Sequence, residues 1–371
     1  GREELDYIFD PNDHWGFVEQ AVEILETTFP SRIFRRHDAI ATVERDIHGG
    51  ARWRAWSVAD LTGLLNRVGR WSQTTQDGDR RRAYVPERLV KIHHLAIADE
   101  LPLCESCTTL PPLDPTTLEP TRFSEGYCEI SRSYFLPSPQ LDLERLRRIY
   151  DTPASPARAV SAYMRLVDIY SDFPWRTSSH QIFGAAIALT VALRRSMDVA
   201  PMMFVSANNK GVGKTKLISA AAASVHGSTP PLASLPVREE ELKKVLDSLV
   251  HTDTDMFIAD NVASRIGGAT LDAFLTSPLH SYRPLGVTDT RVAPNRVFIG
   301  ATGNNASLSG DTDRRAIMIR LVTDLENPEQ RRGFRYPDLL ATARSRVSDT
   351  WCAILEILRA WRDVGADERD A

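Results

Sequence analysis

A short loop between an apolar run and a helical stretch places the strongest constraint on what this chain can fold into. The loop spans residues 207–217, Ala-Asn-Asn-Lys-Gly-Val-Gly-Lys-Thr-Lys-Leu, after the apolar run 202–205 and before the helical stretch 217–225. A strand that delivers the chain, small residues that turn backbone N–H groups inward and a helix N-terminus together form a cradle for phosphate groups. The sequence therefore predicts an α/β fold with a phosphate-binding loop.

Each residue type in this loop has an expected role. Lys214 is expected to reach the β- and γ-phosphates of a nucleotide, and the Thr215 hydroxyl to ligate Mg²⁺. Asn208 stands where such loops usually begin with a glycine, and Asn tolerates left-handed backbone better than other non-glycine residues do. We expect ATP with Mg²⁺ as the ligand, held by Asn208, Asn209, Lys210, Gly211, Val212, Gly213, Lys214, Thr215 and Lys216.

The apolar run 255–260 ends in a carboxylate, Asp260. Such a run fits a parallel strand covered on both faces, and Asp260 at its carboxyl end is expected to hold Mg²⁺ together with Thr215. The next residue is Asn261, where many ATPases carry a Glu that polarises the attacking water. An amide orients water but cannot accept its proton, so Asp260 serves as base, another carboxylate does, or turnover is slow.

Polar residues follow the next apolar run, 296–302. Asn304 and Asn305 are placed to hold the lytic water or the γ-phosphate, and Arg314 and Arg315 precede a further apolar run, 316–322. Two adjacent arginines at such a junction are either a solvated turn or an arginine finger. In this context we favour a finger that reaches the γ-phosphate of a neighbouring subunit.

Taken in order, these motifs resemble the helicase-like ATPase domain of phage and plasmid replication proteins. That family consists of AAA+ ATPases related to superfamily-three helicases, often fused behind a primase. The resemblance covers roughly residues 85–365, most strongly from 165, through the segments 168–174 (Asp-Ile-Tyr-Ser-Asp-Phe-Pro), 258–262, 283–286, 301–305 and 310–315. It implies a P-loop NTPase core and an ATP-driven ring, a hexamer, that moves along DNA. It further implies a preference for single-stranded DNA, a primase module upstream or as a partner, and a cytoplasmic location in a bacterial host cell.

The stretch 280–291 lies where such motors project a hairpin into the ring pore. Its candidate contacts to the DNA backbone are His280, Tyr282, Arg283 and Arg291. For Arg283 a structural ion pair with a carboxylate is an equal alternative.

Length and charge set limits on this interpretation. At 371 residues the chain exceeds the size of one hydrophobic core, and its net charge of −4 argues against a generally basic nucleic-acid binder. No apolar run approaches the length of a membrane span. The predicted organisation is a mixed α+β accessory domain at 1–103, a linker at 104–140, the ATPase core with a helical lead-in at 141–325, and a helical segment at 326–371.

The N-terminal part offers two basic segments. Strands expected at 32–36, 39–43 and 52–56 interleave arginine with aromatic residues, which suits either nucleic-acid stacking or a half-buried sheet with arginines outside, and we favour the sheet. Arg80–Arg82 are predicted to be a charged loop. Cys104, Cys107 and Cys128 allow a zinc site, but the spacing supplies no second close pair, so reduced thiols are the default.

Two other classes of function compete with the DNA motor. One is a nucleotide-switched replication initiator or helicase loader, for which slow hydrolysis at Asn261 would suffice. The other is a nucleotide-gated assembly or defence ATPase. Stimulation of ATP hydrolysis by single-stranded DNA distinguishes the motor from both.

Overall fold

The chain divides into two compact units, which are described separately. Residues 1–109 and 125–136 form the first unit, and residues 110–124 and 137–371 form the second. The segment 104–140, expected to be a linker, therefore contributes to both. The computed structural model describes residues 6–8, 10, 13–47, 49–75, 77–129, 131–262, 265–283, 290–304 and 307–365.

The described part of the first unit combines three helices with three small sheets, whose strand orders are β1-β5-β6, β2-β3-β4 and β7-β9-β8. Its elements are β1 (Asp6–Ile8), α1 (His14–Thr28), β2 (Ile33–Arg36), β3 (Ala39–Arg45), β4 (Ala51–Ala55), α2 (Val58–Val68), β5 (Arg70–Thr74), β6 (Arg80–Arg82), α3 (Glu87–Glu100), β7 (Ser106–Thr108), β8 (Gly126–Cys128) and β9 (Ser133–Phe135).

Local sequence signals explain the helices of this unit. Asp13 and Ser57 cap α1 and α2, because each side chain accepts a hydrogen bond from a backbone N–H of the first turn. The apolar faces of the three helices pack in one buried cluster, which includes the indole of Trp71. Arg80–Arg82 differ from the expected loop: they form strand β6, because they pair antiparallel with β5.

The expected arginine-rich sheet is present as β2-β3-β4, with the antiparallel pairings that its alternating pattern predicts. Cys104 and Cys107 pack in an apolar cluster with Phe34 and Tyr134 beside this sheet. Among the described residues, no group of three or more His, Cys, Asp or Glu side chains is placed to hold a metal ion.

The second unit is built on a five-stranded parallel sheet with the strand order β11-β12-β15-β10-β16. The elements of this unit are α4 (Leu143–Asp151), α5 (Pro156–Asp168), α6 (Ser178–Leu193), the 3₁₀ turn η1 (Arg194–Ser196), β10 (Met202–Ala207), α7 (Lys214–His226), β11 (Leu232–Ala233), α8 (Glu239–His251), β12 (Met256–Val262), α9 (Ala269–Thr276), β13 (Leu279–Tyr282), β14 (Arg291–Pro294), β15 (Phe298–Asn304), η2 (Gly310–Arg315), β16 (Ala316–Leu321), η3 (Pro328–Gln330), α10 (Leu339–Ser345) and α11 (Val347–Gly365).

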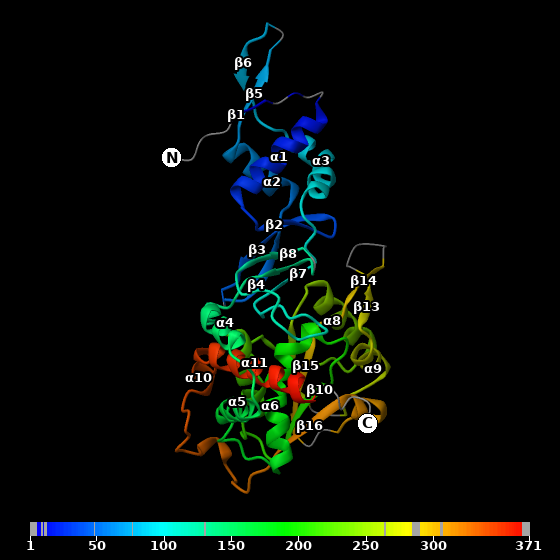
Figure 1. Ribbon diagram of the computed structural model, residues 1–371. Helices are drawn as coiled ribbons and strands as arrows, with labels where there is room; N and C mark the ends of the chain where they lie inside the picture. Colours follow the sequence, from blue (N-terminus) through cyan, green and yellow to red (C-terminus); the bar gives the residue numbers. More distant parts are fainter. Residues whose placement is uncertain are drawn as a thin grey trace. The chain divides into compact units, whose positions relative to one another are not determined.

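Helices cover both faces of this sheet, which is why its central strands are almost entirely apolar. On one face, Met202 and Phe204 of β10 pack with α8 and α9 in one apolar cluster. On the other face, Ile218 of α7 lies against Gly300 of β15, where an added β-carbon would come within 3.1 Å of the Ile218 side chain. The helix α6 contacts the strand β16, and Figure 1 shows α6 in green. The expected α/β fold with a parallel sheet is therefore present.

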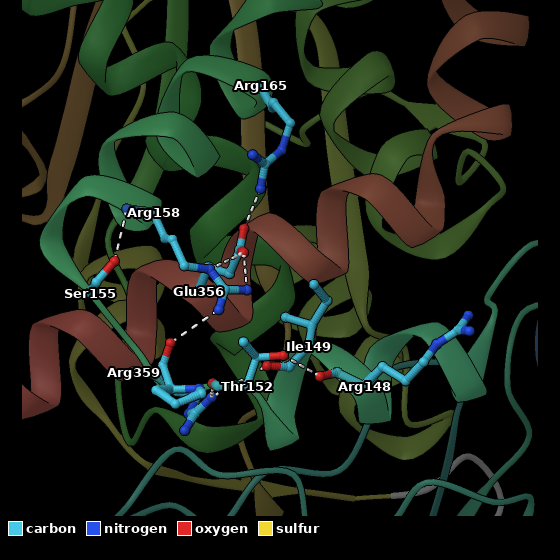
Figure 2. Close-up of polar contacts among 9 residues, drawn as sticks. Arg148, Ile149, Thr152, Ser155, Arg158, Arg165, Glu356 and Arg359 are labelled. Atoms are coloured by element: carbon cyan, nitrogen blue, oxygen red, sulfur yellow. Dashed lines mark hydrogen bonds and ion pairs between the residues drawn. The ribbon is translucent and has the colours of Figure 1, made fainter.

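The C-terminal segment forms two helices, α10 and α11, which meet at Arg346. Trp351 of α11 is fully buried and its Nε1 donates to the carbonyl of Val225 at the end of α7, 3.0 Å away. Glu356 of α11 lies between Arg158 and Arg165 of α5, and Figure 2 shows both guanidinium groups directed at its carboxylate. These contacts hold the last helix against the helices that surround the sheet.

None of the described helices is long and apolar enough to cross a membrane.

Candidate nucleotide-binding site

The glycine-containing loop joins the end of β10 to the start of α7, as the sequence predicts. Gly211 and Gly213 have positive φ angles of 74° and 98°, so these two positions require the conformational freedom of glycine. Asn208 does not adopt the left-handed conformation expected of it. Its amide instead exchanges two hydrogen bonds with the backbone of Thr323, at 2.8 Å and 3.1 Å, and Asn209 donates to the carbonyl of Leu325. The loop is therefore fixed to the segment that follows β16.

Lys214, the first residue of α7, is largely buried, and its Nζ donates to Asn304 Oδ1 at 2.7 Å. Burial lowers the pKa of the Lys214 ammonium, and the nearby charge of Asp260 partly opposes that effect. Asn304 is the last residue of β15, which lies beside β10 in the sheet. The predicted phosphate-binding lysine and the predicted amide are thus in direct contact. Asn305 lies outside the described residues.

Asp260 lies at the carboxyl end of β12 and accepts two hydrogen bonds at Oδ1. The Thr215 hydroxyl donates from 2.5 Å and the Thr302 hydroxyl from 2.8 Å. The Thr302 hydroxyl in turn accepts from the backbone N–H of Asn261 at 3.0 Å, where β12 departs from regular pairing and Asn261 has a φ of 53°. The Asn261 side chain is exposed. Sequence reasoning missed Thr302; the signal was a hydroxyl within an apolar strand.

A cleft of about 590 Å³ opens beside this loop. One wall consists of the loop and the start of α7, and includes the exposed side chain of Lys216. The opposite wall comes from the segments before α6 and after β16, and is mostly apolar and aromatic, with Asp172, Glu329 and Arg331 as its charged residues. Its apolar and aromatic lining residues are Ile169, Phe173, Pro174, Leu325, Pro328, Phe334, Tyr336, Pro337 and Leu339. The cleft therefore has a cationic, hydrogen-bonding end and an apolar end.

Asp168 anchors part of this apolar wall. Its carboxylate accepts from the Tyr336 hydroxyl and from Arg346 at 3.1 Å, and forms an ion pair with Arg335 at 2.7 Å. Burial acts to raise the pKa of Asp168, but these hydrogen bonds and the arginine charges outweigh it and hold that pKa below its usual value. The segment 168–174 was already singled out by the family resemblance, but its role as an anchor was not foreseen.

Two side chains lie directly over the glycines of the loop. A β-carbon on Gly213 would come within 3.2 Å of the Phe173 ring, and one on Gly211 would come within 2.6 Å of Glu329 Oε2. Glu329 belongs to the turn η3 and its side chain is exposed at the mouth of the cleft. A carboxylate is therefore held against the loop that is predicted to bind phosphate. Nothing in the sequence around Glu329 indicated this contact.

Arg314 and Arg315 lie on η2, and neither lines the cleft as far as the described residues define it. The Arg314 side chain is 78% exposed and pairs with Asp311. Arg315 is half-buried and donates to the carbonyl of Asp311 at 2.7 Å. Of the two, Arg314 has the freedom to reach a second molecule.

The hairpin expected at 280–291 is present as β13 and β14, with residues 284–289 outside the described part. Tyr282 is 1% exposed and packs in the core, and His280 is half-buried with Nε2 2.7 Å from Asp247 of α8. These two side chains stabilise the base of the hairpin, so we no longer regard them as DNA contacts. Arg283 is exposed and Arg291 half-buried, and both stay candidates.

No protein-family model matches this sequence, and no curated protein matches it. Among solved structures, the chain is similar to the apo A form of the C-terminal region of NrS-1, with 11% sequence identity and a TM-score of 0.36, over 94% of this chain and 69% of that one. A likeness at this level supports no conclusion about this chain, so its functional assignment depends on the site geometry.

Proposed function

We propose that this chain binds ATP and hydrolyses it with Mg²⁺. One observation carries the proposal: Lys214 and Thr215, at the start of one helix, contact Asn304 and Asp260, at the carboxyl ends of two parallel strands. Ligands of open parallel sheets bind at this edge, and a helix N-terminus there attracts anions. The loop, its two left-handed glycines and the adjoining cleft supply the remaining parts of a triphosphate site.

The donor set suits the metal. The Thr215 hydroxyl and the Asp260 carboxylate are adjacent oxygen groups, the ligand type that Mg²⁺ prefers, and this ion usually keeps several waters and phosphate oxygens as its other ligands. When bound, Mg²⁺ would neutralise charge that develops on the phosphates. Thr215 and Asp260 would hold it.

The protein side chains divide the remaining work. Lys214 exchanges its bond with Asn304 for the phosphates, and its desolvated charge stabilises the transferred group. Asn304 is then free to orient the attacking water. Asp260 accepts hydrogen bonds from Thr215 and Thr302, and its charge acts on Lys214. It is therefore the first candidate for the base that Asn261 cannot be.

The exposure of Arg314 supports an assembly in which sites are completed between subunits. We propose a ring, a hexamer by the family resemblance, in which Arg314 contacts the neighbour's γ-phosphate. We further propose that the ring moves along DNA, single strands preferred, through the β13–β14 hairpin with Arg283 and Arg291. A primase module would act upstream or as a partner.

Asn261 favours a second candidate, a nucleotide-switched initiator or loader with slow turnover. Its exposed amide replaces the expected glutamate at a backbone position that the Thr302 hydroxyl fixes.

Steady-state ATP hydrolysis with and without single-stranded DNA tests these functions, with omission of Mg²⁺ and the Lys214→Ala variant as controls. Several-fold stimulation by DNA that Lys214→Ala abolishes supports the motor. Hydrolysis indifferent to DNA favours the initiator. If the Lys214→Ala variant hydrolyses ATP as fast as the parent protein, the assignment of the nucleotide site is wrong.

A further inference from the structure

The β5–β6 hairpin of the first unit carries an exposed row of arginines. Arg80, Arg81 and Arg82 form β6, the edge strand of its sheet, and all three side chains are exposed. The residues paired with them across β5 are uncharged: Thr74, Gln73 and Ser72. Figure 1 shows this hairpin extending past the helices of its unit. The hairpin therefore presents cationic groups to solvent on both faces of a narrow ribbon.

Within the described residues, none of these three arginines has a carboxylate partner. Within the part of the chain that the structure describes, the side chains of Arg80 and Arg81 make no ion pair or hydrogen bond, and the Arg82 guanidinium lies 5.5 Å from the centre of the Tyr84 ring. By contrast, three arginines of the β2-β3-β4 sheet have carboxylate partners: Arg35 pairs with Asp99, and Arg52 and Arg54 share Glu44.

The local charge is opposite to that of the whole chain. Residues 70–91 contain six basic and three acidic side chains, whereas the chain as a whole has a net charge of −4. Asp77 and Asp79, in the turn between the two strands, do not pair with the hairpin arginines within the described residues. An unneutralised cationic ribbon on an acidic protein indicates a partner that is a dense polyanion.

We propose that the β5–β6 hairpin binds the phosphate backbone of duplex DNA, independently of the nucleotide site. Arg80 and Arg82 point to the same face, about 6.8 Å apart along the strand, and Arg81 points to the other face. Guanidinium groups bind phosphate through paired N–H donors. Because β1 pairs only with Arg70–Ser72 of β5, the part of the hairpin toward the turn is a two-stranded ribbon. Such a ribbon is narrow enough to enter the major groove of DNA, between the two phosphate backbones.

The groups that the hairpin exposes favour a duplex over a single strand. Single-strand binders stack successive bases on exposed aromatic rings. Here Trp71 is buried in the core, and Tyr84, just after β6, is 65% exposed. Three exposed arginines beside one exposed ring supply more contacts for phosphates than for bases, which suits paired strands.

Charged edge strands have another role that the experiment must separate, which is to prevent edge-to-edge aggregation. The hairpin variant carries Arg80→Gln, Arg81→Gln and Arg82→Gln. The matched control carries Arg35→Gln, Arg52→Gln and Arg54→Gln, which remove the same charge from arginines that have carboxylate partners. Thermal melting establishes that each variant is folded, without reliance on the proposed ATP hydrolysis.

Binding to a short fluorescent duplex is measured by anisotropy without nucleotide, so that failure of the proposed ATPase does not affect the result. The hairpin variant is expected to bind at least about tenfold more weakly at about 100 mM salt, with the slope of log K against log salt reduced by up to about 3, because each arginine no longer displaces counterions. The control is expected to stay within about twofold of the parent protein.

Three results would overturn the proposal. The first is duplex binding by the hairpin variant equal to that of the parent, whether or not the variant aggregates. The second is an equal loss in the control, because net charge alone would then explain the effect. The third is a loss confined to single-stranded DNA.

Discussion

The Lys214 ammonium donates to Asn304 Oδ1 across 2.7 Å and so joins the first residue of α7 to the last residue of β15. The two residues are far apart in the sequence, and both were candidates for contact with a γ-phosphate. Burial removes water from the Lys214 ammonium, and the hydrogen bond to Asn304 partly replaces that lost hydration. It also holds the amide where an attacking water would need orientation.

This contact predicts different losses for its two partners. Lys214→Ala should reduce ATP hydrolysis at least about 100-fold, because a desolvated cation at the phosphates is removed. Asn304→Ala should reduce kcat about tenfold or more and change nucleotide affinity less than about threefold, because water orientation matters in the chemical step. Hydrolysis assays and nucleotide titrations measure both. Lys244→Ala, at an exposed lysine paired with Glu241, is the control and should change neither quantity. Equal effects of Asn304→Ala on kcat and affinity would contradict its proposed role.

The exposed Arg314 predicts complementation between two inactive proteins. Arg314→Ala should lose ATP hydrolysis and keep nucleotide binding, and mixing it with Lys214→Ala should restore part of the activity. In a mixed ring, some sites combine an intact Lys214 with an intact Arg314 from the neighbour. Hydrolysis rates across a series of mixing ratios test this. Mixtures that stay inactive would place Arg314 outside the neighbour's site, and loss of nucleotide binding in Arg314→Ala would indicate a role within its own subunit.

Glu329 predicts a gain of affinity on mutation. Its carboxylate lies against Gly211, where a bound triphosphate would bring like charge, and two unit charges about 4 Å apart in water repel by about 1 kcal/mol. Glu329→Gln should therefore tighten ATP binding about fivefold. Isothermal titration with a non-hydrolysable ATP analogue measures the change. Glu326→Gln is the matched control, because Glu326 is exposed three residues earlier and does not line the cleft. Weaker binding by Glu329→Gln would instead assign the carboxylate a role in holding the ligand.

The carboxylate of Glu356 predicts a stability effect remote from the cleft. Its side chain is 9% exposed and pairs with Arg158 and Arg165, whose side chains are 32% and 50% exposed. Breaking a fully buried pair costs about 3–5 kcal/mol; because these guanidiniums stay partly in water, we expect about 2 kcal/mol for Glu356→Ala. Urea unfolding measures this change in the free energy of unfolding. Arg165→Ala should cost less than half as much, and equal losses would contradict the central position of Glu356.

His93 predicts acid sensitivity of the first unit. Burial, and then the nearby His14, lower the pKa of His93 below its ordinary value of 6.5, and Nδ1 of His14 lies 2.8 Å from His93 Nε2. The unfolded chain therefore takes up a proton at higher pH than the folded chain does. The contribution of neutral His93 to the free energy of unfolding is fully present above about pH 6.5. It decreases as the pH falls from there toward the lowered pKa of His93. Thermal melting of His93→Gln between pH 7.5 and 5.5 should show a smaller decrease in Tm than the parent protein, whereas His94→Gln should match the parent. An unchanged pH dependence in His93→Gln would exclude this pair as the source.

Local patterns in the sequence were sufficient for the elements around the site. The parallel strands ending at Ala207, Val262 and Asn304, and the helix that starts at Lys214, lie where apolar runs and the glycine loop predicted them. The hairpin predicted at 280–291 is also present, as the antiparallel strands β13 and β14. These features depend on residues close together in the chain. Because parallel strands place their carboxyl ends at one edge of the sheet, the order of the motifs alone predicted that Asp260 and Asn304 would lie beside the loop.

The tertiary structure decided which side chains face the site, the core or solvent. Tyr282 and His280 belong to a correctly predicted hairpin, yet one packs in the core and the other contacts Asp247. Glu329 reaches Gly211, and Thr302 reaches Asp260, across sequence distances that no periodicity encodes. Arginines occur in β6 as they do in β2 and β4. Arg35, Arg52 and Arg54 have carboxylate partners, whereas Arg80–Arg82 have none among the described residues. Periodicity and backbone preference act over a few residues, so the sequence by itself determined where strands, helix and loop form; contacts between distant side chains depend on how those elements pack, and only the fold could assign them.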